Sequence, residues 1–208
     1  MRTSTIVALF AVTLIPALVR ADDPEPVSAA DVAKVFGRLP AECSLYTGLG
    51  SCPRGKPGGF ERSREVAAFS RAIAEQARDL TEAVTAATFV AYESAVDSHK
   101  IGDKKSQEGA SYGGLQLKEF WVPKADAMDV DKSVRAWLKL KRQSEALCAS
   151  NPPDARLAAV ASGNCAHGWR LVERRMRVVR KIVADLRADR AAAAGMRVAG
   201  DQREVGVE

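Results

Sequence analysis

The chain has 208 residues, 47% of them hydrophobic and 27% charged, with a formal net charge of +5. This length suits one domain with a substantial core. Beyond the N-terminus, no stretch is long and apolar enough to span a bilayer, which excludes an integral membrane protein once that N-terminus is removed.

The N-terminus is typical of a secretory signal peptide. Arg2 supplies a positive charge, residues 6–19 are mostly apolar, and Val19-Arg20-Ala21 offers small residues at the cleavage positions. The alternative is a membrane anchor, but the run is shorter than the roughly 20 residues that span a bilayer. We expect residues 1–21 to be removed and the protein to be periplasmic or extracellular. Its basic charge then favours an anionic surface or polymer outside the membrane over nucleic acid.

Four cysteines fit an oxidising compartment. They allow three connectivities, and the short loops favour the local pairs Cys43–Cys52 and Cys148–Cys165. The absence of Cys-x-x-Cys spacing argues against zinc or thiol redox chemistry. We therefore expect the cysteines to form structural disulfides, with no metal and no cofactor.

Residues 22–60 are predicted to form an N-terminal arm rich in proline, glycine and polar residues, with a disulfide loop. A short helix is predicted from Ala29 to Leu39, with Ser28 as its N-cap. From Arg62 to about Glu93, apolar residues recur at helical spacing, and Thr81 offers a second start, so this stretch is read as one helix or as two meeting near Leu80.

Residues 95–127 are predicted to be a loop region, with a small hairpin as an option, because glycines and Pro123 interrupt any helical period. A helix capped by Asp129 or Asp131 follows. Its predicted inward residues are Val130, Val134, Trp137, Leu138 and Leu147. After the Asn-Pro-Pro-Asp break, a short helix spans about Ala155 to Ser162 and ends at Gly163.

The last helix shows the clearest period in the chain, with an apolar stripe at Trp169, Val172, Met176, Val179, Val183 and Leu186. Its basic residues are read as a solvated face, with attraction to an anionic cell wall as the alternative: Arg170, Arg174, Arg175, Arg177, Arg180, Lys181, Arg187 and Arg190. Residues 196–208 are predicted to be a flexible tail. The fold class is mainly α, with its principal domain at residues 61–195.

Glu93 is the first candidate for chemistry. It follows Phe89, Val90, Ala91 and Tyr92, where the helix is expected to end. A carboxyl at the edge of an apolar wall is partly desolvated, and desolvation disfavours its charged form. A carboxylic acid that keeps its proton can donate it to a leaving oxygen, as glycoside cleavage requires.

The residues after Glu93 add a resemblance to a known family. Glu93-Ser94, then Gly102-Asp103, then the segment Ser111-Tyr112-Gly113-Gly114-Leu115-Gln116-Leu117 resemble the signature of goose-type lysozymes and soluble lytic transglycosylases. In that lysozyme-like superfamily, a helix delivers Glu-Ser and a Gly-Leu-(Met/Phe)-Gln segment follows. The resemblance covers about residues 80–185.

The resemblance implies a lysozyme-like helical domain that cleaves the β-1,4 bond between N-acetylmuramic acid and N-acetylglucosamine in peptidoglycan glycan strands. Glu93 would be the general acid, with Ser94 orienting it. Gly114, Leu115 and Gln116 would floor the saccharide groove, and Ser111 and Tyr112 would join the substrate site. Asp103 has two readings, a catalytic base and a turn residue. Gln116 has the alternative of bonding loop backbone, and Glu93 that of a solvated glutamate at a helix end.

The sequence also departs from the family. Val160 and Ala161 stand where the second motif has tyrosine and asparagine, and the family's methionine before Gln116 is missing. With Asp103 as base the enzyme would be an inverting lysozyme; without it, a substrate group would complete the reaction and give a 1,6-anhydro sugar. A non-catalytic peptidoglycan-binding protein is the alternative from another class. His99 and His167 are read as surface or polar-network residues, and Trp121, like Tyr112, as core or sugar-stacking.

Overall fold

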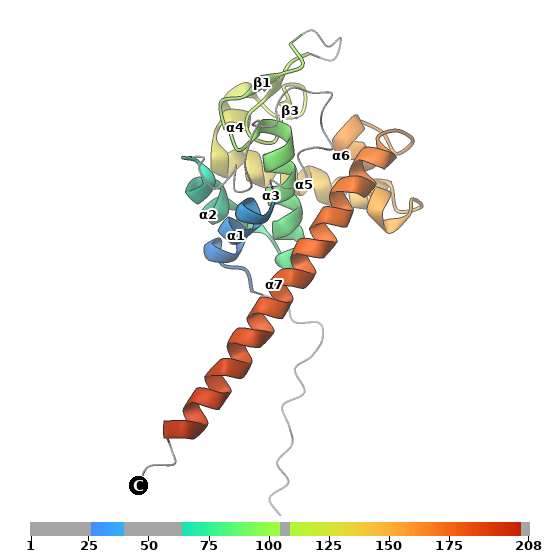
Figure 1. Cartoon of the computed structure of the whole chain (residues 1–208). Helices are drawn as coiled ribbons and strands as arrows, with labels where there is room; N and C mark the ends of the chain where they lie inside the picture. The colour runs from blue at the N-terminus through green and yellow to red at the C-terminus, as the bar shows by residue number, and fades with distance from the viewer. Residues whose placement is uncertain (1–25, 40–63, 105–108, 205–208) are drawn as a thin grey trace, which may run out of the picture.

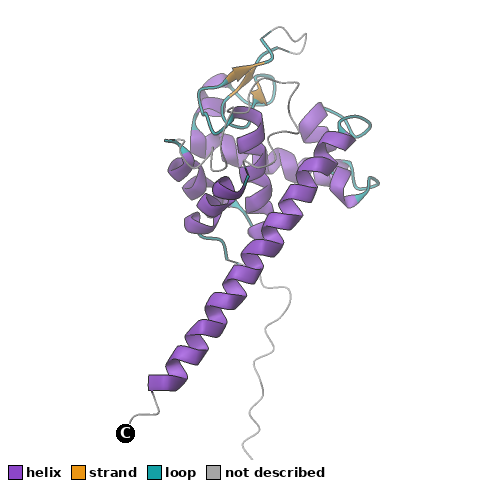
Figure 2. Ribbon diagram, in the orientation of Figure 1, coloured by secondary structure: helices purple, strands orange, loops and turns teal. Residues whose placement is uncertain are grey.

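The computed structural model describes residues 26–39, 64–104 and 109–204, with side chains described up to residue 195. The predicted mainly α fold is confirmed, and it carries one small antiparallel sheet (Figures 1 and 2). The predicted signal peptide, most of the N-terminal arm and the predicted Cys43–Cys52 pair lie outside the described residues. Within them, no helix combines the length and apolar character that crossing a membrane requires.

Helix α3 (Leu80–Ser94) is the centre of the fold. All of its residues except Thr81 and Glu93 are buried, since the sequence is apolar or small on every face. The helices around it are α1 (Ala29–Arg38), α2 (Val66–Gln76), α5 (Val130–Leu147) and α7 (Trp169–Glu204). Glu93 therefore reaches the surface at the C-terminal end of α3, as Thr81 does at its start.

The N-terminal helix forms as predicted, and Ser28 is its N-cap. The Ser28 hydroxyl accepts from the backbone N–H of Asp31, and the Asp31 carboxylate accepts from the backbone N–H of Ser28. This capping box satisfies two backbone donors at the helix start. Val32, Val35 and Phe36 then face the core.

The long helical stretch after Arg62 is two helices, α2 and α3, as one of the two readings had it. The predicted cap Thr81 is wrong by two positions: Asp79 caps α3 through a 2.8 Å bond from the backbone N–H of Glu82 to Asp79 Oδ1. The Asp79 carboxylate serves the same purpose that was assigned to the Thr81 hydroxyl.

The predicted loop region holds a three-stranded sheet of β1 (Ile101–Gly102), β2 (Ser111–Tyr112) and β3 (Leu117–Lys118), in the order β1-β2-β3. Ile101 pairs with Tyr112, and Tyr112 with Leu117. Gly113 turns β2 toward β3 at φ +76, where a Cβ would lie 1.7 Å from the carbonyl oxygen of Ala127. Only glycine fits there. A short helix that the sequence did not predict, α4 (Lys124–Met128), follows.

Helix α5 begins at the predicted cap Asp129, which bonds the backbone N–H of Lys132 at 2.9 Å. Val134, Trp137 and Leu138 are buried as expected, but the inward placement of Leu147 is wrong, because its side chain is 71% exposed. The predicted helix at Ala155–Ser162 is instead a 3₁₀ turn, η3 (Pro153–Ala155), followed by α6 (Ala158–Ser162). Gly163 ends α6 in the left-handed conformation, as predicted.

The Cys148–Cys165 disulfide is present and joins the end of α5 to the loop before α7. Helix α7 continues to Glu204, past Gly195, where the sequence predicted a tail. It buries Val172, Val179, Val183 and Leu186 of the predicted stripe, together with Val178 and Ile182. The solvated basic face is confirmed at Arg170, Arg174, Arg177, Arg180, Lys181 and Arg187, but wrong for Arg175, which is buried.

Candidate functional site

A cleft of about 450 Å³ lies where the end of α3, the sheet, the loop after β3 and α6 meet. Glu93 and Asp103 line it together with Leu115, Gln116, Val160 and Ala161. These residues come from four separate parts of the sequence motif. The rest of the lining is Phe89, Lys118, Phe120, Trp121, Trp137, Ser162 and Gly163.

The end of α3 places Glu93 at the cleft. Ala95 adopts the left-handed conformation and stops the helix, with its backbone N–H bonded to the carbonyl of Ala91. Ser94 is buried, and its hydroxyl donates to Val90 O and accepts from the backbone N–H of Asp97. Ser94 therefore stabilises the helix end, which orients Glu93 through the backbone.

Arg175 of α7 is the partner of Glu93. Its Nη1 donates to Glu93 Oε1, although the two residues are 82 positions apart. The Arg175 side chain is only 3% exposed, whereas that of Glu93 is 28% exposed. The predicted apolar surroundings of Glu93 are therefore incomplete: the carboxylate is the anionic member of a partly buried ion pair.

Ser111 of β2 contacts two other polar residues of the predicted motif, Asp103 and Gln116. Its Oγ lies 2.9 Å from Gln116 Oε1 and 3.3 Å from Asp103 Oδ2, so the hydroxyl can donate to either oxygen. Gln116 Nε2 donates to Gly113 O at 2.8 Å, and Lys118 Nζ lies 3.1 Å from Asp103 Oδ2. A side chain at position 102 would meet Gln116 Oε1 at 2.0 Å, so Gly102 leaves room for this cluster.

Backbone strain gathers around the same cleft. Within the described residues, the non-glycine residues with positive φ are Ala95, Val96, Asp103 and Gln116. All four lie in the segment that carries Glu93, Asp103 and the Gly-Leu-Gln turn. Such conformations cost about 1–3 kcal/mol each, and they cluster at functional sites, where the surrounding structure compensates for them.

The remaining predicted site residues do not line the cleft. Ser111 is buried, and Gly114 packs against α2, where a Cβ would meet the Phe69 ring at 2.3 Å. Tyr112 is half-buried beneath Lys124, whose Nζ is 5.1 Å from its ring. Of the three residues expected to form a groove floor, Leu115 and Gln116 line the cleft, whereas Gly114 packs against Phe69.

Aromatic side chains line the cleft. Phe120 is 63% and Trp121 37% exposed, and their rings meet edge to face at 4.9 Å. Phe89 and Trp137 contact each other deeper in the core, also at 4.9 Å. Exposed aromatic residues beside a polar cleft are typical of a binding site. The exposure of Trp121 argues against the core role.

A second hollow of about 500 Å³ adjoins the cleft and shares Trp121, Val160 and Gly163 with it. Its other lining residues carry no charge: Leu140, Gln143, Ser144, Ala146, Leu147 and Ala159. Val160, which the resemblance would align with a tyrosine, therefore lines both spaces. The two histidines lie elsewhere and are exposed, in keeping with the surface interpretation of His99 and His167.

Sequence reasoning missed Arg175 as the partner of Glu93, and it missed Lys118, Phe120 and Trp137 as cleft residues. A signal for Arg175 was present, because it stands three residues after Val172 and four before Val179, on the same helical face. Nothing in the local pattern distinguished Phe120 or Lys118 from ordinary loop residues. Among the described residues, no group of three or more His, Cys, Asp or Glu side chains is arranged to hold a metal ion.

No protein-family model matches the chain, and neither a curated protein nor a solved structure matches it. The resemblance to goose-type lysozymes and lytic transglycosylases therefore stays a prediction from the residues that carry it.

Proposed function

We propose that the protein is an exported glycosidase that cleaves the β-1,4 bond between N-acetylmuramic acid and N-acetylglucosamine in peptidoglycan, with Glu93 as general acid. The observation that carries this proposal is the cleft itself. Glu93, Asp103, Leu115-Gln116 and Val160-Ala161 are spread over nearly 70 residues of sequence, yet they line one hollow. A chance match to the motif would not require these positions to meet.

The proposed chemistry begins from the ion pair of Glu93 and Arg175. To act as an acid, Glu93 takes up a proton before the reaction and gives it to the glycosidic oxygen as that bond breaks. Asp103 offers two routes to completion. As a base, Asp103 would activate a water molecule. If its contacts with Lys118 and Ser111 prevent this, the substrate's own N-acetyl group or C6 hydroxyl completes the reaction.

The first test replaces Glu93 with glutamine, which keeps the shape of the side chain and removes its acidic proton. General acid catalysis is worth about 10²–10⁴-fold, so clearance of purified peptidoglycan should fall at least about a hundredfold. The matched control is Glu75→Gln, at a glutamate whose side chain is 61% exposed on α2. A control that loses as much activity as Glu93→Gln would contradict the assignment.

Asp103→Asn separates the two routes. A large loss with reducing-end products supports a water-activating base. A small loss with 1,6-anhydromuropeptides, detected by mass spectrometry, supports the transglycosylase route.

A second candidate function is a peptidoglycan-binding protein without catalysis. The specific observation that favours it is the buried guanidinium on Glu93, together with Val160 and Ala161 in place of tyrosine and asparagine. Wild-type protein that binds purified sacculi in a pull-down, clears none of them, and is unaffected by Glu93→Gln would establish this function and rule out the first.

The proposal includes export. Protein recovered outside the cytoplasm of an expressing cell should begin near Asp22, after cleavage at Ala21. An intact N-terminal mass on that protein would contradict signal-peptide removal.

A further inference from the structure

The burial of Arg175 calls for a reason. It is a guanidinium on a helix face otherwise occupied by Val172, Val179 and other apolar residues, with 3% of its side chain exposed. Burying an unpaired charge is costly, and burying a paired one often adds little stability compared with an apolar residue. A basic residue in this stripe is therefore a poor choice for stability alone.

The contacts of Arg175 converge on the last two turns of α3. Its guanidinium carbon lies 4.5 Å from the Phe89 ring centroid and 5.9 Å from that of Tyr92, while Nη1 donates to Glu93. The two rings fix the plane of the guanidinium, because a cation is attracted to an aromatic face. The plane in turn fixes where the donor points.

Glu93 is the residue that needs such support. A glutamate side chain has three rotatable bonds, and ordering a long flexible side chain costs conformational entropy. Arg175 engages Oε1, and Glu93 still lines the cleft with 28% of its side chain exposed. The carboxyl is thus anchored through one oxygen while the side chain remains open to a ligand.

We propose that Arg175 is a positioning residue that holds the Glu93 carboxyl in the cleft before the ligand arrives. This inference rests on the proposed function for its kinetic consequence, but the placement of Glu93 can be tested without any activity. Arg175 acts through Glu93; it neither transfers a proton nor lines the cleft.

The test compares Arg175→Met, Arg175→Lys and a control, Arg142→Met. Methionine keeps apolar bulk beside Phe89 and removes the donor. Lysine keeps the charge but not the planar fork. Arg142 also pairs with a buried glutamate, at 2.6 Å from Glu82, on a part of α5 that does not line the cleft, so its loss reports on stability alone.

We expect crystal structures of Arg175→Met to show the Glu93 carboxyl in more than one rotamer or turned away from the cleft, and that of Arg142→Met to show it unmoved. In clearance assays well below the melting temperature, Arg175→Met should lower kcat by about 10–100-fold with KM changed less than about threefold, since a misplacement of about 1 Å can cost a hundredfold. The kcat of Arg175→Lys should lie between those of Arg175→Met and the wild type.

A double-mutant cycle checks that the effect passes through Glu93. In a Glu93→Gln background, Arg175→Met should cause no further loss of kcat. Equal losses in both backgrounds would overturn the proposal, as would a Glu93 carboxyl that keeps its place in Arg175→Met. If the Met variant does not fold, the same structural comparison is made with Arg175→Lys.

The two proposals fail in different ways. Wild-type protein that clears no peptidoglycan sinks the proposed cleavage, while the rotamer of Glu93 in the Arg175 variants still decides the positioning role. Wild-type clearance combined with an unmoved Glu93 and an unchanged kcat in Arg175→Met overturns the positioning role and leaves the proposed function intact.

Discussion

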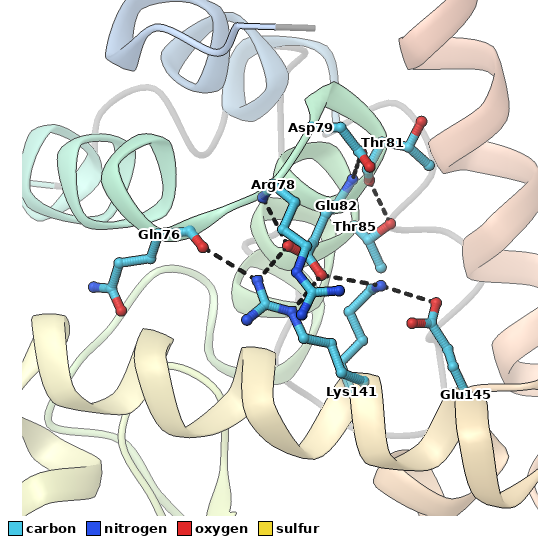
Figure 3. A network of polar contacts seen from close by, with 9 residues as sticks. Gln76, Arg78, Asp79, Thr81, Glu82, Thr85, Lys141 and Glu145 are labelled. Carbon is cyan, nitrogen blue, oxygen red and sulfur yellow. Dashed lines mark hydrogen bonds and ion pairs between the residues drawn. The ribbon is translucent and has the colours of Figure 1, made fainter. Parts of the chain in front are cut away.

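Glu82 is the most heavily bonded carboxylate in the described core. Its side chain is 5% exposed and accepts from Arg142 at 2.6 and 3.0 Å and from the backbone N–H of Arg78 at 2.8 Å (Figure 3). Lys141 lies 3.4 Å away and also pairs with Glu145. One buried anion thus ties α5 to the turn between α2 and α3.

From these contacts we predict how the stability of the protein depends on pH. Burial alone would raise the pKa of Glu82, but the bonds from Arg142 and Arg78 and the charges of Lys141 and Arg142 lower it overall, below 4.5. Because the folded pKa lies below the unfolded one, the stabilisation is complete above about pH 4.5 and is lost as the pH falls through the folded value. We expect the melting temperature to drop on acidification in that range.

Glu82→Gln should remove that pH dependence and cost about 3 kcal/mol at pH 7, near the lower end for breaking a buried ion pair, because Arg142 is partly exposed. Thermal unfolding of both proteins between pH 3 and 7 measures this. Parallel pH curves for wild type and variant would show that another group controls acid stability.

The sequence predicted the surroundings of individual residues where those surroundings are formed by neighbours in the chain. Glu93 at the end of an apolar helix was predicted because its neighbours in sequence define that end. Its pairing with Arg175 was not, because that contact joins residues 82 positions apart and depends on how α7 packs on α3. For the same reason, Asp103 could be suggested as a base but not assigned its contacts with Lys118 and Ser111.

Among the elements, the segment from η3 to the loop after α6 depends on a covalent staple. The Cys148–Cys165 disulfide joins residues 17 positions apart. The segment that it closes includes α6, whose Val160 and Ala161 line the cleft. Closing a loop of this size with a disulfide stabilises a protein by about 3 kcal/mol.

A variant with both Cys148→Ala and Cys165→Ala should therefore melt at a lower temperature. If the proposed cleavage occurs, the variant should also clear peptidoglycan more slowly at temperatures where it remains folded, because the α6 side of the cleft is less well held. Calorimetry and turbidity assays measure the two effects. Wild-type melting in the variant would show that packing alone holds the segment.

Element boundaries were predictable where capping chemistry is written in the sequence. Ser28, Asp129 and Gly163 each end or begin a helix at the predicted position. Asp79 was overlooked in favour of Thr81 because both residue types cap helices and only the backbone conformation distinguishes them. The short helix α4 was missed because Pro123 and nearby glycines concealed it in a region without a helical period.

For the whole molecule, α7 is the element that contacts both the C-terminal end of α3 and the N-terminal helix α1. It runs past the helices around α3, and its C-terminal part extends beyond them (Figure 1). Arg175 contacts the end of α3, whereas Asp189 pairs with Arg38 at 2.6 Å and Arg190 with Asp31 at 2.8 Å, both on α1. The mainly α class was predictable, but this role of a single long helix was not, because it is set by tertiary contacts.

Truncations of α7 test this arrangement. A chain that ends after Leu186 loses both pairs with α1, which should cost about 1–2 kcal/mol, since partly exposed ion pairs are worth up to about 1 kcal/mol each. A chain that ends after Gly195 keeps both pairs and serves as the control. Chemical denaturation of the three lengths measures the difference, and equal stabilities would show that α1 gains nothing from α7.

The position of Val160 between the cleft and the uncharged hollow beside it has a consequence for selective inhibition. A lysozyme-like enzyme with tyrosine at this position would fill part of the space that valine leaves. A small molecule with a polar group for the Glu93 side and an uncharged arm reaching past Val160 would fit this chain and clash with that tyrosine. A single aromatic ring at this position would then decide whether such a compound binds.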